Sequence, residues 1–126
     1  MNASIQFNNV SLSYGEIADE VEVLKGISFA IDTSEVVSIV GPSGSGKTSI
    51  IMLASGLENA TKGSIKINDE EIVGLKEKEL SEVRRKNIGI VFQSFYLIPN
   101  LTAVENVLLS LRDNKTFSTA VRLGIK

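Results

Sequence analysis

The sequence predicts an α/β domain with a core of strand, glycine-rich loop and helix, and an N-terminal part of antiparallel strands. Three observations predict it. The apolar run Val36–Val40 leads directly into the glycine-rich stretch Gly41–Thr48. Apolar and polar residues alternate over 4–14 and again over 23–31, which is typical of strands with one buried face. Residues 88–92 form a second apolar run, typical of a strand in a parallel sheet.

The stretch Gly41–Thr48 fits the pattern G-x-x-x-x-G-K-[ST] of a phosphate-binding loop. A predicted strand precedes it, and the apolar run 50–54 predicts a helix after it, which is the context that this motif requires. The glycines let successive backbone N–H groups converge on phosphate oxygens. The helix that starts near Gly46 adds unpaired N–H groups and a partial positive charge of about half a unit. A glycine- and serine-rich turn that matches by chance is the alternative, but it would not explain both flanks.

Each polar residue of this loop has an expected role. Lys47 places a positive charge beside the β- and γ-phosphates, and the Thr48 hydroxyl is an oxygen ligand for Mg²⁺. Further contacts to phosphate are expected from the loop serines and from backbone amides, at Ser43, Gly44, Ser45, Gly46 and Ser49. The sequence therefore predicts a site for the Mg²⁺ complex of a nucleoside triphosphate.

Composition excludes several classes of function. The chain has 126 residues, which is enough for one domain, and its net charge of −2 offers no basic surface for nucleic acid. Cysteine and histidine are both absent, which excludes disulfides, thiolate metal sites and histidine-based acid–base catalysis. The N-terminus does not have the pattern of a signal peptide, and no apolar run is long enough to span a bilayer. We therefore expect any membrane role to be peripheral.

The remaining elements are predicted from local pattern. Gly56 is a plausible end for the helix after the loop, and Glu105 three residues after Thr102 predicts a capping box. In chain order the elements are a strand over 63–68, a return strand over 71–73, a charged surface helix over 76–86, and a helix from Thr102 through Leu111. Residues 119–126 have a pattern that could start another helix.

Three separated motifs together resemble the nucleotide-binding domain of ABC transporters. They are Val10–Tyr14, which looks like the family's A-loop, the phosphate loop Gly41–Thr48, and Ile88–Gln93, which looks like the strand leading into the Q-loop. The resemblance covers residues 4 to about 111. Residues 79–85 and 97–107 are especially similar to the branch that serves lipoprotein release and macrolide-type export.

The resemblance implies a P-loop NTPase core and a division of the chain. Residues 1–126 would form part of one ABC-type ATP-binding domain, with the C-terminal half of that domain absent. The antiparallel part would comprise 1–35 and 63–74, the P-loop core 36–57 and 75–95, and the start of a helical subdomain 96–126.

The resemblance also implies roles for residues outside the phosphate loop. Tyr14 would stack on adenine, with Val21 or Val23 beside the base. Gln93 would reach the Mg²⁺ and the attacking water, so that Lys47 and Gln93 would be the catalytic residues and Thr48 and Gln93 the metal ligands. Alternatively, Tyr14 covers the core at the end of a strand, Gln93 is a polar residue that ends a strand, and Val21 and Val23 are plain strand residues.

The family's partners are transmembrane permease subunits and a second nucleotide-binding domain. We therefore expect a cytoplasmic protein that is peripheral to the membrane, and no nucleic-acid partner. Phe95, Tyr96 and Leu97 follow the Q-loop and would face the membrane subunit, with local packing as the alternative. The transported substrate depends on the membrane subunits, so this sequence does not identify it.

Several parts of the family's machinery do not occur in this sequence. It has no Leu-Ser-Gly-Gly-Gln signature and no switch histidine. It also lacks the family's second phosphate-site motif, which is four apolar residues followed by Asp and the catalytic Glu. We expect this chain alone to bind Mg-ATP weakly, to turn it over very slowly, and to have limited solubility because strands would be left with open edges. Two alternatives stay open: a nucleotide-binding module without catalysis, and a soluble ABC-type ATPase that does not serve transport.

Overall fold

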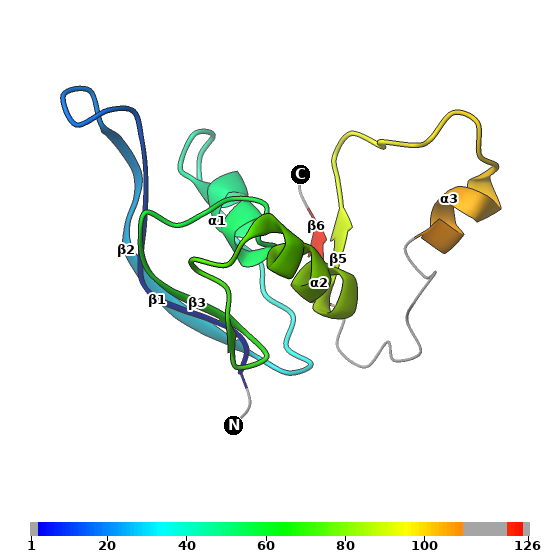
Figure 1. The fold of residues 1–126 in the computed structure, drawn as a ribbon, viewed down its shortest axis with the longest axis horizontal. Coiled ribbons are helices and arrows are strands. Elements are labelled where there is room, and N and C mark those ends of the chain that lie inside the picture. The colour runs from blue at the N-terminus through cyan, green and yellow to red at the C-terminus, as the bar shows by residue number, and fades with distance from the viewer. Residues whose placement is uncertain (1–2, 110–120, 125–126) are drawn as a thin grey trace.

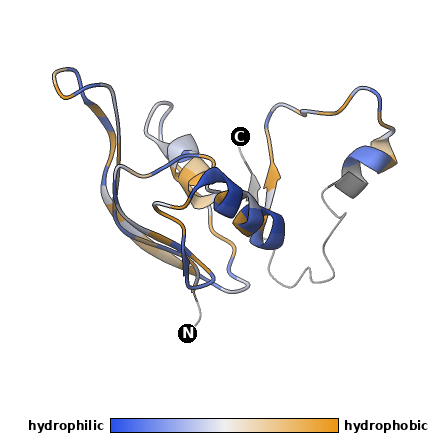
Figure 2. Ribbon diagram, in the orientation of Figure 1, coloured by the Kyte–Doolittle hydropathy of each residue, from blue (hydrophilic) through white to orange (hydrophobic). Residues whose placement is uncertain are grey.

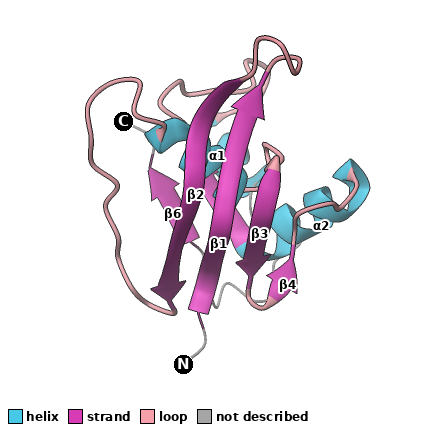
Figure 3. Cartoon of the chain, turned by 90° about the vertical axis from the view of Figure 1, so that its left-hand side faces the viewer, coloured by secondary structure: helices cyan, strands magenta, loops and turns pink. Residues whose placement is uncertain are grey.

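An antiparallel sheet of four strands forms the N-terminal part of the molecule (Figure 3). The structure, a computed structural model, describes residues 3–109 and 121–124. The strands lie in the order β2-β1-β3-β4, and their bounds are Ala3–Tyr14 for β1, Val21–Asp32 for β2, Lys62–Ile67 for β3 and Glu70–Glu71 for β4. Alternation of apolar and polar residues had predicted the three longer strands. The return strand is shorter than the expected 71–73.

Two helices cover one face of this sheet. Figure 3 views the sheet from its other face, so that the helices lie behind the strands. The helices are α1 (Lys47–Ala54) and α2 (Glu77–Asn87). Between sheet and helices lies one core whose buried members are Ile5, Phe7, Val10, Leu12, Leu24, Leu53, Ala54, Ile65, Ile67, Ile72, Leu80 and Val83. Gly56 follows the end of α1 with φ of 68°, the left-handed conformation expected of a helix-ending glycine.

A small parallel sheet follows α2 directly. Its strands are β5 (Ile88–Val91) and β6 (Val121–Gly124). The expectation that a helix starts within 119–126 is wrong for Val121–Gly124, because pairing with β5 gives this backbone hydrogen-bond partners that its local pattern does not reveal. Among the described residues, no helix is long and apolar enough to cross a membrane.

The helix α3 (Ala103–Leu109) lies on the far side of β5 from the antiparallel sheet (Figure 1). Its capping box is confirmed, since the Thr102 backbone N–H donates to the Glu105 carboxylate at 2.8 Å and the Glu105 backbone N–H donates to the Thr102 hydroxyl at 3.2 Å. Residues 110 and 111 of the expected helix lie outside the described residues.

The expected buried strand over 36–40 is not formed. These residues have no strand assignment, and the side chains of Val36 and Val40 are 95% and 87% exposed. A strand of a parallel sheet is stabilised by ladders to its neighbours and by cover on both faces, and no described strand pairs with this segment. Figure 2 shows the segment as a hydrophobic stretch of loop leading to α1. Its sequence favours a strand, but no described strand pairs with it to supply the hydrogen-bond partners that a strand needs.

Candidate phosphate-binding site

A cavity of about 480 Å³ opens at the N-terminus of α1. It is lined by the phosphate loop and by one residue of β2, namely Ser43, Gly44, Gly46, Lys47, Thr48, Ser49 and Val23. Six of the residues expected from the loop motif therefore meet in one concave site. Ser45, the seventh, turns back into the loop, where its hydroxyl donates to the Pro42 carbonyl oxygen at 2.7 Å.

Glycine is required where the loop meets β2. Gly46 precedes α1 with φ of 92°, and a Cβ atom there would lie 2.8 Å from the Leu24 side chain and 3.6 Å from the Val23 carbonyl oxygen. Gly44 has φ of 79°. Both angles lie in the region that residues with a side chain rarely adopt. The two glycines thus let the loop turn tightly into the helix and pack against β2.

The Lys47 ammonium group is held inside the curve of the loop. Its Nζ donates to the carbonyl oxygens of Gly41 and Pro42 at 2.7 and 2.6 Å, and to the Ser45 hydroxyl at 3.3 Å. An ammonium group has three protons to donate, and these contacts use all three. The positive charge is therefore placed at the cavity by acceptors of the loop itself.

The electrostatics of the cavity favour an anion. The first intrahelical hydrogen bond at this end is donated by Ile50 to the Gly46 carbonyl oxygen at 3.1 Å, so the amides of Lys47, Thr48 and Ser49 have no partner within the helix. The first turn carries no acidic residue, and Lys47 is the one charged residue among those that line the cavity. Helix end and ammonium therefore attract negative charge together.

Tyr14 lies at the end of β1 and does not line the cavity. Its neighbour across the sheet is Val21, two residues before the cavity-lining Val23, so the backbone of Tyr14 stands about 7 Å farther along the hairpin. Its side chain is 48% exposed, and its hydroxyl donates to Glu58 Oε2 at 2.9 Å. This hydrogen bond, with smaller effects of burial and of the Glu58 charge, raises the pKa of Tyr14 above its ordinary value.

Gln93 is exposed, two residues after the end of β5, and is likewise not among the residues that line the cavity. Next to it, Phe92 packs edge-on against Tyr96, with ring centroids 5.1 Å apart. Phe95, Tyr96 and Leu97 are 85%, 75% and 65% exposed. The structure thus assembles the phosphate loop, but it does not bring Tyr14 or Gln93 to it.

Sequence reasoning missed three residues that shape this region. The Leu24 side chain packs against Gly46. Glu58 and Thr61 form hydrogen bonds with the end of β1. The alternation in β2 could have marked Leu24 as buried. No local signal marks Glu58 or Thr61, because their partners are 44 and 48 residues away in the chain.

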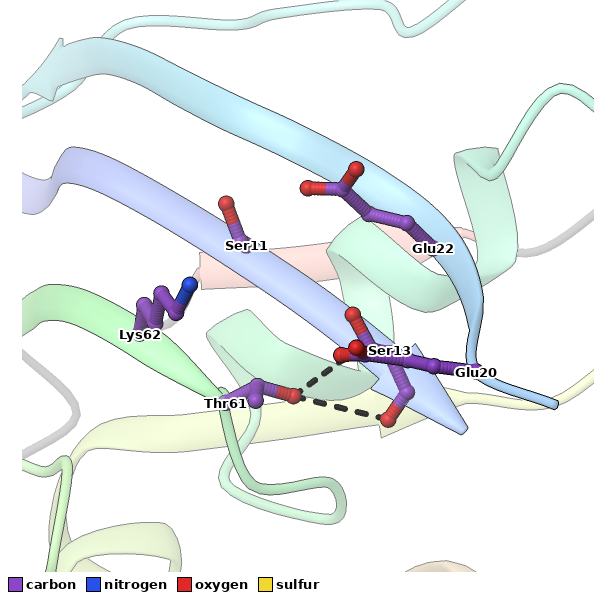
Figure 4. Close-up of a pocket in the computed structure, with 6 residues that line it drawn as sticks. All are labelled: Ser11, Ser13, Glu20, Glu22, Thr61 and Lys62. Atoms are coloured by element: carbon purple, nitrogen blue, oxygen red, sulfur yellow. Dashed lines mark hydrogen bonds between the residues drawn. The ribbon is translucent and has the colours of Figure 1, made fainter. Parts of the chain in front are cut away.

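A second, smaller cavity of about 210 Å³ lies across the ends of β1, β2 and β3 (Figure 4). Its lining mixes hydroxyl groups with one cation and two carboxylates, from Ser11, Ser13, Glu20, Glu22, Thr61 and Lys62. Because charges of both signs line this cavity and are open to solvent, and Glu22 already pairs with Lys25, the cavity has no clear preference for a ligand of one sign.

Comparison with known proteins identifies the same family throughout. The family described as "ABC transporter" matches residues 24–125. The bacitracin export ATP-binding protein BceA of Halalkalibacterium halodurans is 41% identical, over 98% of this chain and 52% of its own length. The lipoprotein-releasing system ATP-binding protein LolD of Bacteroides thetaiotaomicron is 43% identical, over 83% of this chain and 46% of its own.

A solved structure agrees with these relatives. The dimeric, post-hydrolysis state of the ATP-binding cassette MJ0796, bound to ADP and Pi, superimposes with a TM-score of 0.80 at 40% identity. The match covers 86% of this chain and 47% of that one. The chain thus spans about half the length of the relatives that it matches.

Proposed function

Because this chain belongs to the ABC transporter family of ATP-binding proteins, we propose that it supplies the nucleotide site of a subunit that couples ATP binding and hydrolysis to membrane transport. The transport would be of the export or lipoprotein-release type, as the names of the similar proteins suggest. One observation carries the proposal: the phosphate loop folds around a cavity with Lys47 and the free amides of α1 at its wall.

In this proposal Lys47 exchanges partners when ATP binds. Its present acceptors are two neutral carbonyl oxygens and a hydroxyl, and a phosphate oxygen forms a stronger, charge-assisted hydrogen bond. The loop holds the ammonium group close to where the β- and γ-phosphates would lie, so little reorganisation is needed. Lys47 then stabilises the charge on the phosphates, which is most of what a protein contributes to phosphoryl transfer.

The site also fits a Mg²⁺ ion that arrives with the nucleotide. The Thr48 hydroxyl lines the cavity, whereas no carboxylate does, and in residues 3–109 and 121–124 no cluster of three or more acidic side chains could hold a metal. Mg²⁺ prefers few protein ligands together with phosphate oxygens and water. When bound, it would neutralise charge between the β- and γ-phosphates, with Thr48 as one ligand and Gln93 as a second.

Tyr14 would extend the site along the hairpin, and Gln93 would join it through movement. We propose that the Tyr14 ring stacks on adenine, because it lies next along the hairpin from Val23 at the wall of the cavity. Gln93 would approach the metal and the attacking water when the segment after β5 closes on the nucleotide. Lys47 and Gln93 are therefore the proposed catalytic residues of this chain.

The proposed partners are permease subunits and a second ATP-binding domain. The exposed aromatic and aliphatic side chains at 95–98 would contact a permease at the cytoplasmic face of a membrane. The solved relative is dimeric, and a second ATP-binding domain that contains the signature sequence would bring it onto the nucleotide of this chain. We infer that residues 1–126 alone bind Mg-ATP but hydrolyse it very slowly, because the hydrolytic carboxylate is also absent from the sequence.

Calorimetric titration with ATP and Mg²⁺ tests the proposal. We expect saturable binding that weakens at least about tenfold in Lys47→Ala, equivalent to about 1.4 kcal/mol. The matched control is Lys78→Ala in α2, outside the site, which should bind like the parent chain. Equal binding by all three proteins, or none by the parent, would contradict a functional phosphate loop in this chain.

Turnover and partners separate the alternatives. Rapid hydrolysis that Lys47→Ala abolishes would show that the chain is catalytically complete, contrary to our inference. Binding without any turnover, even in the presence of a full-length relative, would favour a nucleotide-binding module. Copurification with a membrane protein would exclude a soluble ATPase that does not serve transport.

A further inference from the structure

The segment that links α1 to β3 is fastened to the end of β1 through the backbone of Ser11 and Ser13 and through the Tyr14 hydroxyl. At the end of the segment Thr61 lies beside Ser13 (Figure 4). Its hydroxyl accepts a hydrogen bond from the Ser13 backbone N–H at 2.9 Å, and its N–H donates to the Ser11 carbonyl oxygen at 2.9 Å. At its start, Glu58 accepts the hydrogen bond from the Tyr14 hydroxyl. Backbone and side chain of the strand end are thus held by one short segment.

Glu58 itself is fixed by its position beside the end of α1. The amides of Leu57 and Glu58 both donate to the Met52 carbonyl oxygen, at 3.0 and 3.3 Å. Oε1 of its carboxylate accepts from the Asn59 N–H at 3.0 Å, which leaves Oε2 for Tyr14. Glu58 is half-buried as a residue, and these two hydrogen bonds give its carboxylate a defined orientation.

Helix α1 connects the phosphate loop to the segment that holds Tyr14. α1 begins at Lys47, beside the cavity, and Glu58 follows its last turn. Eight helical residues have a fixed length of about 12 Å. The hydrogen bond from Tyr14 to Glu58 therefore ties the ring to the same rigid element whose other end carries the phosphate loop.

We propose that Glu58 is a positioning residue for the base of the nucleotide, acting through the hydroxyl of Tyr14. This inference rests on the proposed function, because it requires that Tyr14 receives adenine. A tyrosine at the exposed end of a hairpin has free rotation about two side-chain bonds. The carboxylate restricts that rotation and keeps the ring at one distance from the phosphate loop, so that base and phosphates of one ligand are bound together without a loss of side-chain entropy on binding.

The test compares ATP with inorganic tripolyphosphate, which has the phosphates but no base. For the parent chain we expect ATP to bind more tightly than tripolyphosphate. In Glu58→Ala the affinity for ATP should fall by about threefold to tenfold, a part of what complete loss of base stacking would cost, while the affinity for tripolyphosphate stays unchanged. The control Glu70→Ala removes the same charge from an exposed residue of β4, and should change neither affinity.

Two further variants separate positioning from a structural role. Tyr14→Phe keeps the ring and removes only the hydroxyl, so it should reproduce the loss seen in Glu58→Ala, and the double variant should lose no more than either single one. The chain has no tryptophan and two tyrosines, so in a Tyr96→Phe background the fluorescence of Tyr14 reports directly on stacking. ATP, but not tripolyphosphate, should quench it.

The outcomes are distinct. Absence of tripolyphosphate binding to the parent chain would overturn the proposed phosphate site itself. Equal affinity of the parent for ATP and tripolyphosphate would overturn the role of Tyr14 in base binding, and with it that of Glu58. An unchanged ratio of the two affinities in both Glu58→Ala and Tyr14→Phe, or additive losses in the double variant, would overturn the positioning role alone.

Discussion

Arg84 Nη1 donates a hydrogen bond to the carbonyl oxygen of Gly56 at 2.7 Å, so that the last turn of α2 caps the end of α1. The Arg84 side chain is 19% exposed, and its other guanidinium nitrogen pairs with Glu77. The phosphate loop lies at the opposite end of α1. This contact therefore holds the helix that carries the candidate site against the rest of the core.

Replacing Arg84 should destabilise the chain. Arg84→Met keeps most of the aliphatic stem but leaves the Gly56 carbonyl oxygen without its charged donor, which should lower the free energy of unfolding by about 1.5–3 kcal/mol. Urea denaturation measures it. Arg85→Met is the control, since its ion pair with Glu82 lies at the surface and should contribute less than about 1 kcal/mol. Equal losses in both variants would contradict a special role for Arg84.

Gly63 should not tolerate a side chain. It has φ of 95° at the start of β3, and a Cβ atom would lie 2.4 Å from the Asn9 carbonyl oxygen and 2.7 Å from that of Asn8. Because both obstacles are backbone atoms, Gly63→Ala should cost about 2 kcal/mol or more in the free energy of unfolding. Gly89→Ala, where no atom lies within 4 Å, should change it by less than about 0.5 kcal/mol. A thermal melt that ranks the two variants the other way would disprove this.

Glu71 should make stability depend on acid pH. Burial raises the pKa of this carboxyl, but hydrogen bonds from the Ser64 hydroxyl and from the backbone N–H groups of Val73 and Ile65 outweigh burial, so its pKa lies below its ordinary value. A carboxyl with a lowered pKa in the folded state stabilises the fold above its unfolded pKa of about 4.3, and this contribution is lost as the pH falls through the folded pKa.

Glu71→Gln should therefore be less stable than the parent chain at pH 7, and the difference should shrink towards pH 3. Urea denaturation at a series of pH values measures this. Glu70→Gln changes the exposed neighbour in the same strand and serves as the control. A difference between Glu71→Gln and the parent that does not vary with pH would contradict the role given to the ionised carboxylate.

Asn106 should hold the exposed loop before α3 in shape. Its side-chain amide accepts from the Ile98 N–H at 2.9 Å and donates to the carbonyl oxygens of Ile98, Leu101 and Thr102 at 3.3, 3.1 and 3.0 Å. Asn106→Ala removes all four contacts. Cleavage by chymotrypsin at Phe95, Tyr96 or Leu97 should become several-fold faster, because local opening of the loop would require less free energy.

The control for this experiment is Asn100→Ala, an exposed position in the same loop. It should be cleaved at the rate of the parent chain. If Asn106→Ala were cleaved no faster than Asn100→Ala, the loop would owe its order to other contacts.

The sequence by itself determined the features that depend on near neighbours in the chain. The spacing of Gly44 and Gly46 specifies a tight loop before a helix, because few other residues adopt their φ values of 79° and 92°. Alternation over 4–14 and 23–31 specified two strands and their buried faces. The capping box of Thr102 and Glu105 marked a helix start from residues three apart. Each of these signals is local, so it can be interpreted without knowing the fold.

Only the tertiary structure decided the features that depend on distant partners. The run Val36–Val40 favours a strand but forms none among the described residues, whereas Val121–Gly124 forms one because β5 lies beside it. The carboxylate that holds Tyr14 comes from 44 residues away in the chain and leaves no trace in local pattern. A hydrogen bond or strand pair between distant residues depends on where the whole chain places its donor and acceptor, and the sequence near either residue does not contain that information.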